Sequence, residues 1–180
     1  MSIGLDCLIE VRNKQTRQWE EHNFVHREPL AYDYAIFSYD AIAFLTGRRN
    51  DDCMPWIGQE IAGRGWPTDS DWLNETSGSG WYIETVMETL DNDNDYARSF
   101  VSLKELLDFD YDQTFLNRTN PDFHMGSGTA IPRDERRSLP QGEGYPDTVR
   151  NCISQSFFNA LEYLKELGDP QDVRVIYNLS

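Results

Sequence analysis

The sequence predicts one α+β domain over residues 1–180, in which a small, mainly antiparallel sheet carries helices packed on one face and long irregular loops join the elements. Three observations predict this fold. Apolar and polar residues alternate near the N-terminus, an amphipathic helix is expected near the C-terminus, and another alternating segment follows that helix. The length suits a single domain, and 39% hydrophobic residues supply enough material for a core.

The N-terminal quarter of the chain predicts a hairpin and a helix. Alternation over residues 3–11 indicates a strand with one buried face, residues 13–16 a turn, and residues 17–25 the partner strand. Asp33 is a suitable N-cap for a helix to residue 46, with Gly47 as its C-cap. Arg48 and Arg49 follow at the negative end of the helix dipole, so dipole complementation is favoured over an anion site.

The central part of the chain carries weaker signals. Residues 50–80 are irregular and hold three of the five tryptophans, so this loop is expected either to pack onto the domain or to bind a partner. Residues 81–90 favour a short helix. Ser102 and Glu105 have the spacing of a capping box that opens another helix through residue 107, and residues 117–145 are again loop-like.

The C-terminal part gives the clearest elements. Asp147 is expected to cap a long helix, because apolar residues then recur along one stripe. The stripe consists of Ile153, Phe157, Ala160, Leu161, Leu164 and Leu167. Gly168 ends this helix, Pro170 prevents its continuation, and a final strand is expected over residues 173–177.

Negative charge is the strongest compositional feature. The chain has 31 acidic and 16 basic residues, a net charge of −15, and nine of the acidic residues fall between Glu84 and Asp112. Such a chain is expected to avoid bare nucleic-acid phosphate and anionic membranes. It contains no apolar run long enough to span a bilayer, and its first residues lack the pattern of a secretion signal, so a cytoplasmic protein is predicted.

No cofactor or metal is predicted. The three cysteines are widely spaced, so buried reduced thiols are favoured over a disulfide. His22 and His26 lack the further ligands of a zinc site. The segment from Asp91 to Asp95 resembles the start of a calcium loop, but Tyr96 and Ser102 stand where glycine and glutamate are required. No nucleophile–base motif is present either, so the sequence leans toward a non-enzymatic protein.

Six short segments, taken in order, resemble a group of small, uncharacterised proteins of tailed phages and prophages. The segments are Gly4-Leu5-Asp6-Cys7-Leu8, Tyr34–Phe37 with Gly47-Arg48-Arg49, Arg64-Gly65-Trp66-Pro67, Ser99-Phe100-Val101-Ser102-Leu103, Phe109-Asp110-Tyr111-Asp112 and Leu167–Val175. In that group they look like a Met-Gly-Cys-Asp-Ile-His opening, a helix followed by arginine, an Arg-Gly-Leu-Pro loop, a Ser-Trp-Leu-Thr stretch, a Tyr-Asp-Trp segment and a terminal helix–strand.

The resemblance implies a phage protein that works in the cytoplasm of the host cell, and one α+β domain. It implies no activity. Histidines of the family pattern are replaced here at Leu8 and near Ala97 and Ser99, so a histidine-based role is not carried over.

The first hypothesis is that an acidic face binds and inhibits a basic host protein, either a nucleic-acid-binding or a defence protein. The candidate residues are Asp91, Asp93, Asp95, Asp108, Asp110 and Asp112. If residues 108–115 form a strand, the last three carboxylates lie about 6.5–7 Å apart on one face, with aromatic side chains on the other. That spacing approximates the phosphate repeat of nucleic acid. The alternative interpretation of the same row is an ordinary solvated strand face.

A second hypothesis belongs to another class, a protein that binds or hydrolyses a small ligand such as a nucleotide. Its site combines Asp6, the Arg48 and Arg49 pair, Arg64 and Trp66. Arginine binds phosphate through two hydrogen bonds, and tryptophan stacks on a base.

Overall fold

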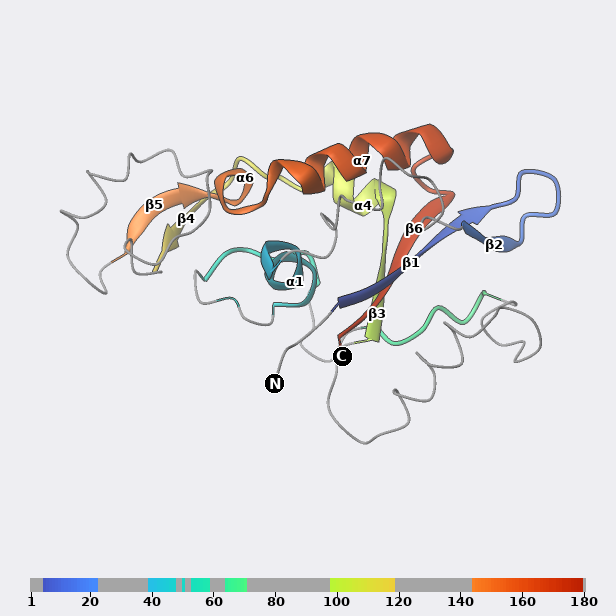
Figure 1. Ribbon diagram of the computed structural model, residues 1–180, viewed down its shortest axis with the longest axis horizontal. Coiled ribbons are helices and arrows are strands. Elements are labelled where there is room, and N and C mark those ends of the chain that lie inside the picture. Colours follow the sequence, from blue (N-terminus) through green and yellow to red (C-terminus); the bar gives the residue numbers. More distant parts are fainter. Residues whose placement is uncertain are drawn as a thin grey trace.

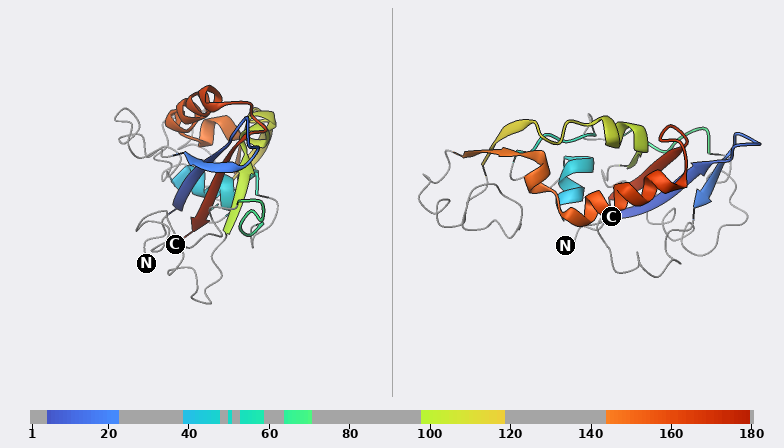
Figure 2. Two further views of the ribbon diagram at one scale, coloured as in Figure 1. Left: turned by 90° about the vertical axis from the view of Figure 1, so that its right-hand side faces the viewer. Right: turned by 90° about the horizontal axis from the view of Figure 1, so that it is seen from above.

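The computed structural model describes residues 5–22, 39–47, 50, 53–58, 64–70, 98–118 and 144–179. These residues form a four-stranded sheet in the order β2-β1-β6-β3 and a two-stranded sheet of β4 and β5. Every strand pair is antiparallel. The helices α4 and α7 run along one face of the larger sheet (Figures 1 and 2). The predicted α+β class is therefore confirmed.

Strands β1 (Leu5–Arg12) and β2 (Trp19–His22) form the predicted hairpin. The turn between them is built by Asn13, whose side-chain oxygen accepts hydrogen bonds from the backbone N–H groups of Gln15 and Thr16. Asparagine favours such turns because its side chain replaces a backbone acceptor. The predicted continuation of β2 over residues 23–25 lies outside the described residues.

Strand β6 (Val173–Leu179) lies at the centre of the sheet, between β1 and β3 (Arg98–Ser102). Alternate residues of a strand point to opposite faces. Val175 and its β1 partner Ile9 belong to the core beneath the helices, so Arg174 and its partner Glu10 point to the other face. The second face of this sheet therefore carries buried charges.

Two described helices follow the sequence prediction, although the predicted N-cap of the first, Asp33, lies outside the described residues. Helix α1 (Tyr39–Thr46) ends at Gly47, whose φ of 68° is the left-handed conformation expected of a helix C-cap. Helix α4 (Leu103–Asp108) opens with the predicted capping box, in which Ser102 and Glu105 satisfy each other's backbone N–H groups.

The long C-terminal helix differs from its prediction. Asp147 lies in β5 (Tyr145–Thr148) and does not cap a helix. Thr148 instead caps a short helix, α6 (Val149–Cys152), and α7 (Gln155–Leu167) begins separately after Ser154. The break arises because Ile153 adopts an extended conformation, which interrupts the helical hydrogen bonding that a continuous apolar stripe had predicted.

The core lies between the sheet and helices α1, α4 and α7. Phe44 of α1 is fully buried and contacts the rings of Phe109 and Phe157, with centroid distances of 4.9 and 5.6 Å. A cavity of about 10 Å³ lies within this core among six apolar side chains, which leaves room for no ligand. Within the predicted loop over residues 50–80, Met54 and Ile57 pack onto this core: Met54 is buried, and the Ile57 N–H donates to Phe44 O.

Candidate functional site

The acidic segment forms a turn where the sequence predicted a strand. We call residues 108–112 the acidic turn; it joins α4 to β4 (Thr114–Asn117). The strand prediction for residues 108–112 is wrong because Asp108 still belongs to α4, and Asp110 then accepts a hydrogen bond from the Asp112 N–H at 3.1 Å. Local side-chain bonds of this kind compete with strand pairing. The expected straight row of carboxylates is therefore not formed.

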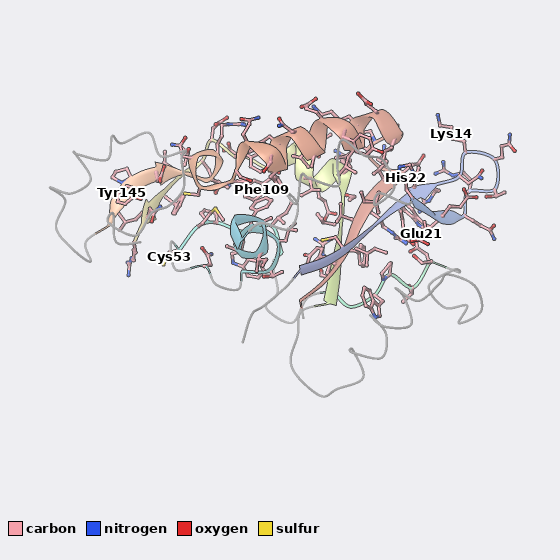
Figure 3. The ribbon with its side chains drawn as sticks, in the orientation of Figure 1. Lys14, Glu21, His22, Cys53, Phe109 and Tyr145 are labelled. Carbon is pink, nitrogen blue, oxygen red and sulfur yellow. The ribbon has the colours of Figure 1, made fainter. Side chains whose placement is uncertain are left out.

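The aromatic and acidic residues of the turn nevertheless separate to opposite sides. Phe109 lies between α7 and α1 (Figure 3), and Tyr111 is buried with its hydroxyl donating to Leu106 O at 2.8 Å. Burial raises the pKa of the Tyr111 hydroxyl above its usual range. The three aspartates Asp108, Asp110 and Asp112 are exposed. The acidic turn is thus anchored by its rings and presents its carboxylates to solvent.

Basic residues of the same chain pair with two of these carboxylates. Lys104 pairs with Asp108 one helical turn away. Arg150 donates to both oxygens of Asp112, at 2.7 and 3.2 Å. The hydrogen bond from Arg150 lowers the pKa of the Asp112 carboxyl below its usual value. The local negative potential of the turn is therefore smaller than its sequence suggests.

Arg150 was missed by sequence reasoning. Its guanidinium lies 5.1 Å from the ring centroid of Phe158 and 5.8 Å from that of Tyr111, and its backbone N–H donates to Tyr111 O at 2.8 Å. Arg150 and Asp112 are 38 residues apart in the sequence, so no local residue spacing predicts their contact.

The predicted acidic face also included three aspartates before the acidic turn. Asp91, Asp93 and Asp95 lie outside the described residues. The described residues include 15 of the 31 acidic residues and 10 of the 16 basic ones, a net charge of −5 out of −15. The acidic turn is the part of the predicted face whose geometry is known.

The Arg64-Gly65-Trp66-Pro67 loop of the second hypothesis belongs to a segment that crosses the larger sheet. We call residues 64–70 the strap; it lies on the face opposite α7 (Figure 1). At one end of the strap, the Arg64 N–H donates to Ser99 Oγ of β3 at 3.1 Å. At the other end, Ser70 donates to Glu10 of β1 at 2.5 Å.

A buried ionic group, which we call the latch, fixes the strap to the sheet. It consists of Glu10, Ser70 and Arg174. Glu10 and Ser70 are fully buried and Arg174 is 5% exposed. Arg174 donates to Glu10 through Nε and to Ser70 Oγ through Nη2, the latter at 2.6 Å. Asp69 extends the group by accepting from Arg174 and from Trp19, both at 2.8 Å.

Arginines and aromatic rings alternate across the same face of the sheet. In order they are Arg12, Trp19, Arg174, Phe100 and Arg64, with guanidinium-to-ring-centroid distances of 4.3, 3.8, 5.4 and 5.8 Å. Distances below about 6 Å give favourable cation–π contacts. Carboxylates pair with the arginines along this stack, so it serves to hold the strap.

Within the described residues, the candidates for the small-ligand site do not lie together. Arg64 pairs with Glu105 at 2.8 Å, and Trp66 is partly buried. Asp6 lies on β1, which β6 separates from the β3 edge that Arg64 contacts. The side chain of Asp6 and both Arg48 and Arg49 lie outside the described residues. The structure therefore describes no cleft that joins these groups.

A third polar group lies beneath the β4–β5 hairpin. The carboxylate of Asp147 accepts from the Asn117 amide at 3.2 Å, the Asn151 amide at 3.0 Å and the Cys152 thiol at 3.6 Å. These donors satisfy a buried carboxylate and join the hairpin to α6. Within the described ranges, no three His, Cys, Asp or Glu side chains are grouped as metal ligands.

The cysteine prediction is right about pairing and partly wrong about burial. Cys7, Cys53 and Cys152 form no disulfide, but only Cys152 is buried, whereas Cys7 is partly buried and Cys53 is exposed. Of the histidines in the metal hypothesis, His22 lies near Tyr163 of α7, with 3.2 Å between Nε2 and Oη; His26 lies outside the described residues.

Comparison with known proteins gives no assignment: no family model, no curated protein and no solved structure matches the chain. None of the helices in the described part of the chain is both long and apolar enough to cross a bilayer.

Proposed function

We propose that this protein binds the basic surface of another protein through an acidic face that includes the acidic turn. The observation that carries the proposal is the outward presentation of Asp108, Asp110 and Asp112 on a turn whose aromatic rings are anchored in the core. A rigid base lowers the entropy lost when a surface is immobilised on binding.

Pairing with Lys104 and Arg150 does not remove these carboxylates from the proposed surface. The Asp108 and Asp112 side chains are 64% and 71% exposed, and ion pairs at such positions contribute little to stability. When a partner with several cations binds, each carboxylate exchanges a weak ion pair within the chain for an ion pair with the partner. The other cations of the partner add long-range attraction to the negatively charged protein. Charge complementarity of this kind raises association rates and makes them sensitive to salt.

The proposal extends to the kind of partner. The phage resemblance and the overall net charge of −15 favour a basic nucleic-acid-binding or defence protein of the host, whose nucleic-acid surface is blocked. Aspartates that occupy a basic groove prevent phosphate from entering it, because both use the same cations.

The test measures release of fluorescent DNA from a panel of basic DNA-binding proteins, by anisotropy at low and raised salt. We expect the protein to release DNA from at least one panel member, and the triple variant D108N/D110N/D112N to require a higher concentration. The control E162Q/E166Q/D169N removes equal charge from the C-terminal end of α7 and the following residues. Equal loss in both variants, or no release by the unaltered protein from any panel member, would contradict the proposal.

A further inference from the structure

One carboxylate of the acidic turn already holds a guanidinium group. Arg150 forms two hydrogen bonds with Asp112, and its planar group lies near the rings of Phe158 and Tyr111. A planar guanidinium matches a carboxylate through paired hydrogen bonds and stacks on aromatic rings, whereas a lysine ammonium does neither as well. The surroundings of Arg150 therefore suit a guanidinium group better than an ammonium group.

The neighbouring pair in the same turn provides a contrast. Lys104 pairs with Asp108 on the surface of α4, and no aromatic contact of Lys104 is seen among the described residues. Asp108 therefore attracts either kind of cation, while the group of Asp112, Tyr111 and Phe158 favours arginine.

Arg150 is also easily displaced from this position. Its side chain is 49% exposed, and its backbone is held independently by the N–H bond to Tyr111 O and by α6. Moving the side chain away breaks a solvent-exposed ion pair and leaves the turn and the helix in place.

We propose that Asp112, Tyr111 and Phe158 form an arginine-recognition site, which Arg150 occupies until an arginine of the basic partner replaces it. This inference rests on the proposed function and narrows it: the partner surface presents arginine at this point. Arg150 acts as an internal competitor, which lowers affinity for weakly basic proteins and leaves the site available to arginine-rich ones.

The test compares an oligoarginine peptide with an oligolysine peptide of equal length, by fluorescence anisotropy. Arg150→Ala vacates the site, and Lys104→Ala removes the same charge beside Asp108 as a matched control. We expect Arg150→Ala to tighten binding of the arginine peptide about threefold or more, with little change for the lysine peptide. Lys104→Ala is expected to affect both peptides equally. Phe158→Leu, combined with Arg150→Ala, should remove the selective gain.

Each other outcome counts against the inference. If Arg150→Ala tightens the binding of both peptides equally, the site does not recognise arginine, and the proposed acidic binding surface is not contradicted. Weaker binding by Arg150→Ala would show that Arg150 supports the site and does not compete for it. If neither peptide binds the protein, both the inference and the proposed function are contradicted. Should Arg150→Ala fail to fold, as judged by circular dichroism, Arg150→Lys replaces it and is expected to give a smaller gain with the same selectivity.

Discussion

The latch and the acidic turn use the same kinds of side chain in opposite ways. In the latch, Glu10 and Arg174 are buried, and their charges are satisfied by each other and by Ser70. In the acidic turn, Asp112 and Arg150 pair in solvent. A buried charge that loses its partner is strongly destabilising, whereas an exposed one is rehydrated. The latch therefore determines where the strap lies, whereas the carboxylates of the acidic turn can exchange partners at little cost in stability.

The largest effect is expected from breaking the latch at one side. Arg174→Met leaves the carboxylate of Glu10 buried without its main cation, and we expect a loss of about 3–5 kcal/mol in the free energy of unfolding. Urea unfolding followed by circular dichroism measures it. The double variant E10L/R174M removes both charges and is expected to recover most of the loss. A double variant as unstable as Arg174→Met would show that packing, and not charge, makes this site sensitive.

A smaller effect is expected from Ser70→Ala. The hydroxyl donates to Glu10 and accepts from Arg174, so its removal leaves two buried groups each short of one bond. We expect a loss of about 1–3 kcal/mol in unfolding free energy and faster hydrogen exchange in the strap. Thr68→Ala changes an exposed residue of the same strap and serves as the control, with an expected change within about 0.5 kcal/mol.

Acid should loosen both ends of the strap. Partial burial raises the pKa of Asp69, but hydrogen bonds from Arg174 and Trp19 outweigh it, so the pKa lies below the usual 3.8. For Glu105, partial burial is likewise outweighed by bonds from Arg64 and Ser102, and the pKa lies below 4.5. A lowered folded-state pKa stabilises the protein above the unfolded-state value, and this contribution is lost as pH falls through the folded one. Asp69→Asn should therefore differ most from the unaltered protein near neutral pH, and the difference should shrink as pH falls below the unfolded-state value of 3.8. An unfolding-free-energy difference independent of pH would contradict the ion-pair role of Asp69.

The smallest effect is expected in the acidic turn. Lys104→Ala breaks an exposed pair with Asp108, and the unfolding free energy should change by no more than about 0.5 kcal/mol. Chemical denaturation of Lys104→Ala and Arg174→Met under the same conditions compares their unfolding free energies directly. A loss as large as that of Ser70→Ala would mean that the turn depends on its ion pairs and is not free to exchange them.

Local sequence signals predicted the elements that depend on local chemistry. The capping box at Ser102, the left-handed Gly47 and the N-terminal hairpin each require residues within a few positions of one another. The start of the C-terminal helix was misplaced because the apolar stripe continues through Ile153, whose extended backbone separates α6 from α7. Thr148, and not Asp147, caps α6.

Groups assembled from distant segments were not predicted. The latch joins Glu10, Ser70 and Arg174, which alternation alone places on solvent-facing positions of strands or in a loop. The one sequence signal was that the aromatic residues Trp19 and Phe100 stand among polar residues on this face of the sheet. Aromatic side chains at such positions indicate that another segment of the chain covers the face. Likewise, the alternation of aromatic and acidic residues around Asp110 was recognised in the sequence, but it was interpreted as a strand. These residues form a turn because α4 extends to Asp108 and the Asp110 side chain accepts a hydrogen bond from the Asp112 N–H.

The central claim is that cations of a partner meet this protein at the acidic turn. Amide chemical shifts recorded during titration with the oligoarginine peptide test it most directly. The largest changes are predicted at residues 108–112 and at Arg150, with the amides of the strap unmoved. Changes concentrated on the strap or on the C-terminal end of α7, with residues 108–112 unaffected, would contradict it.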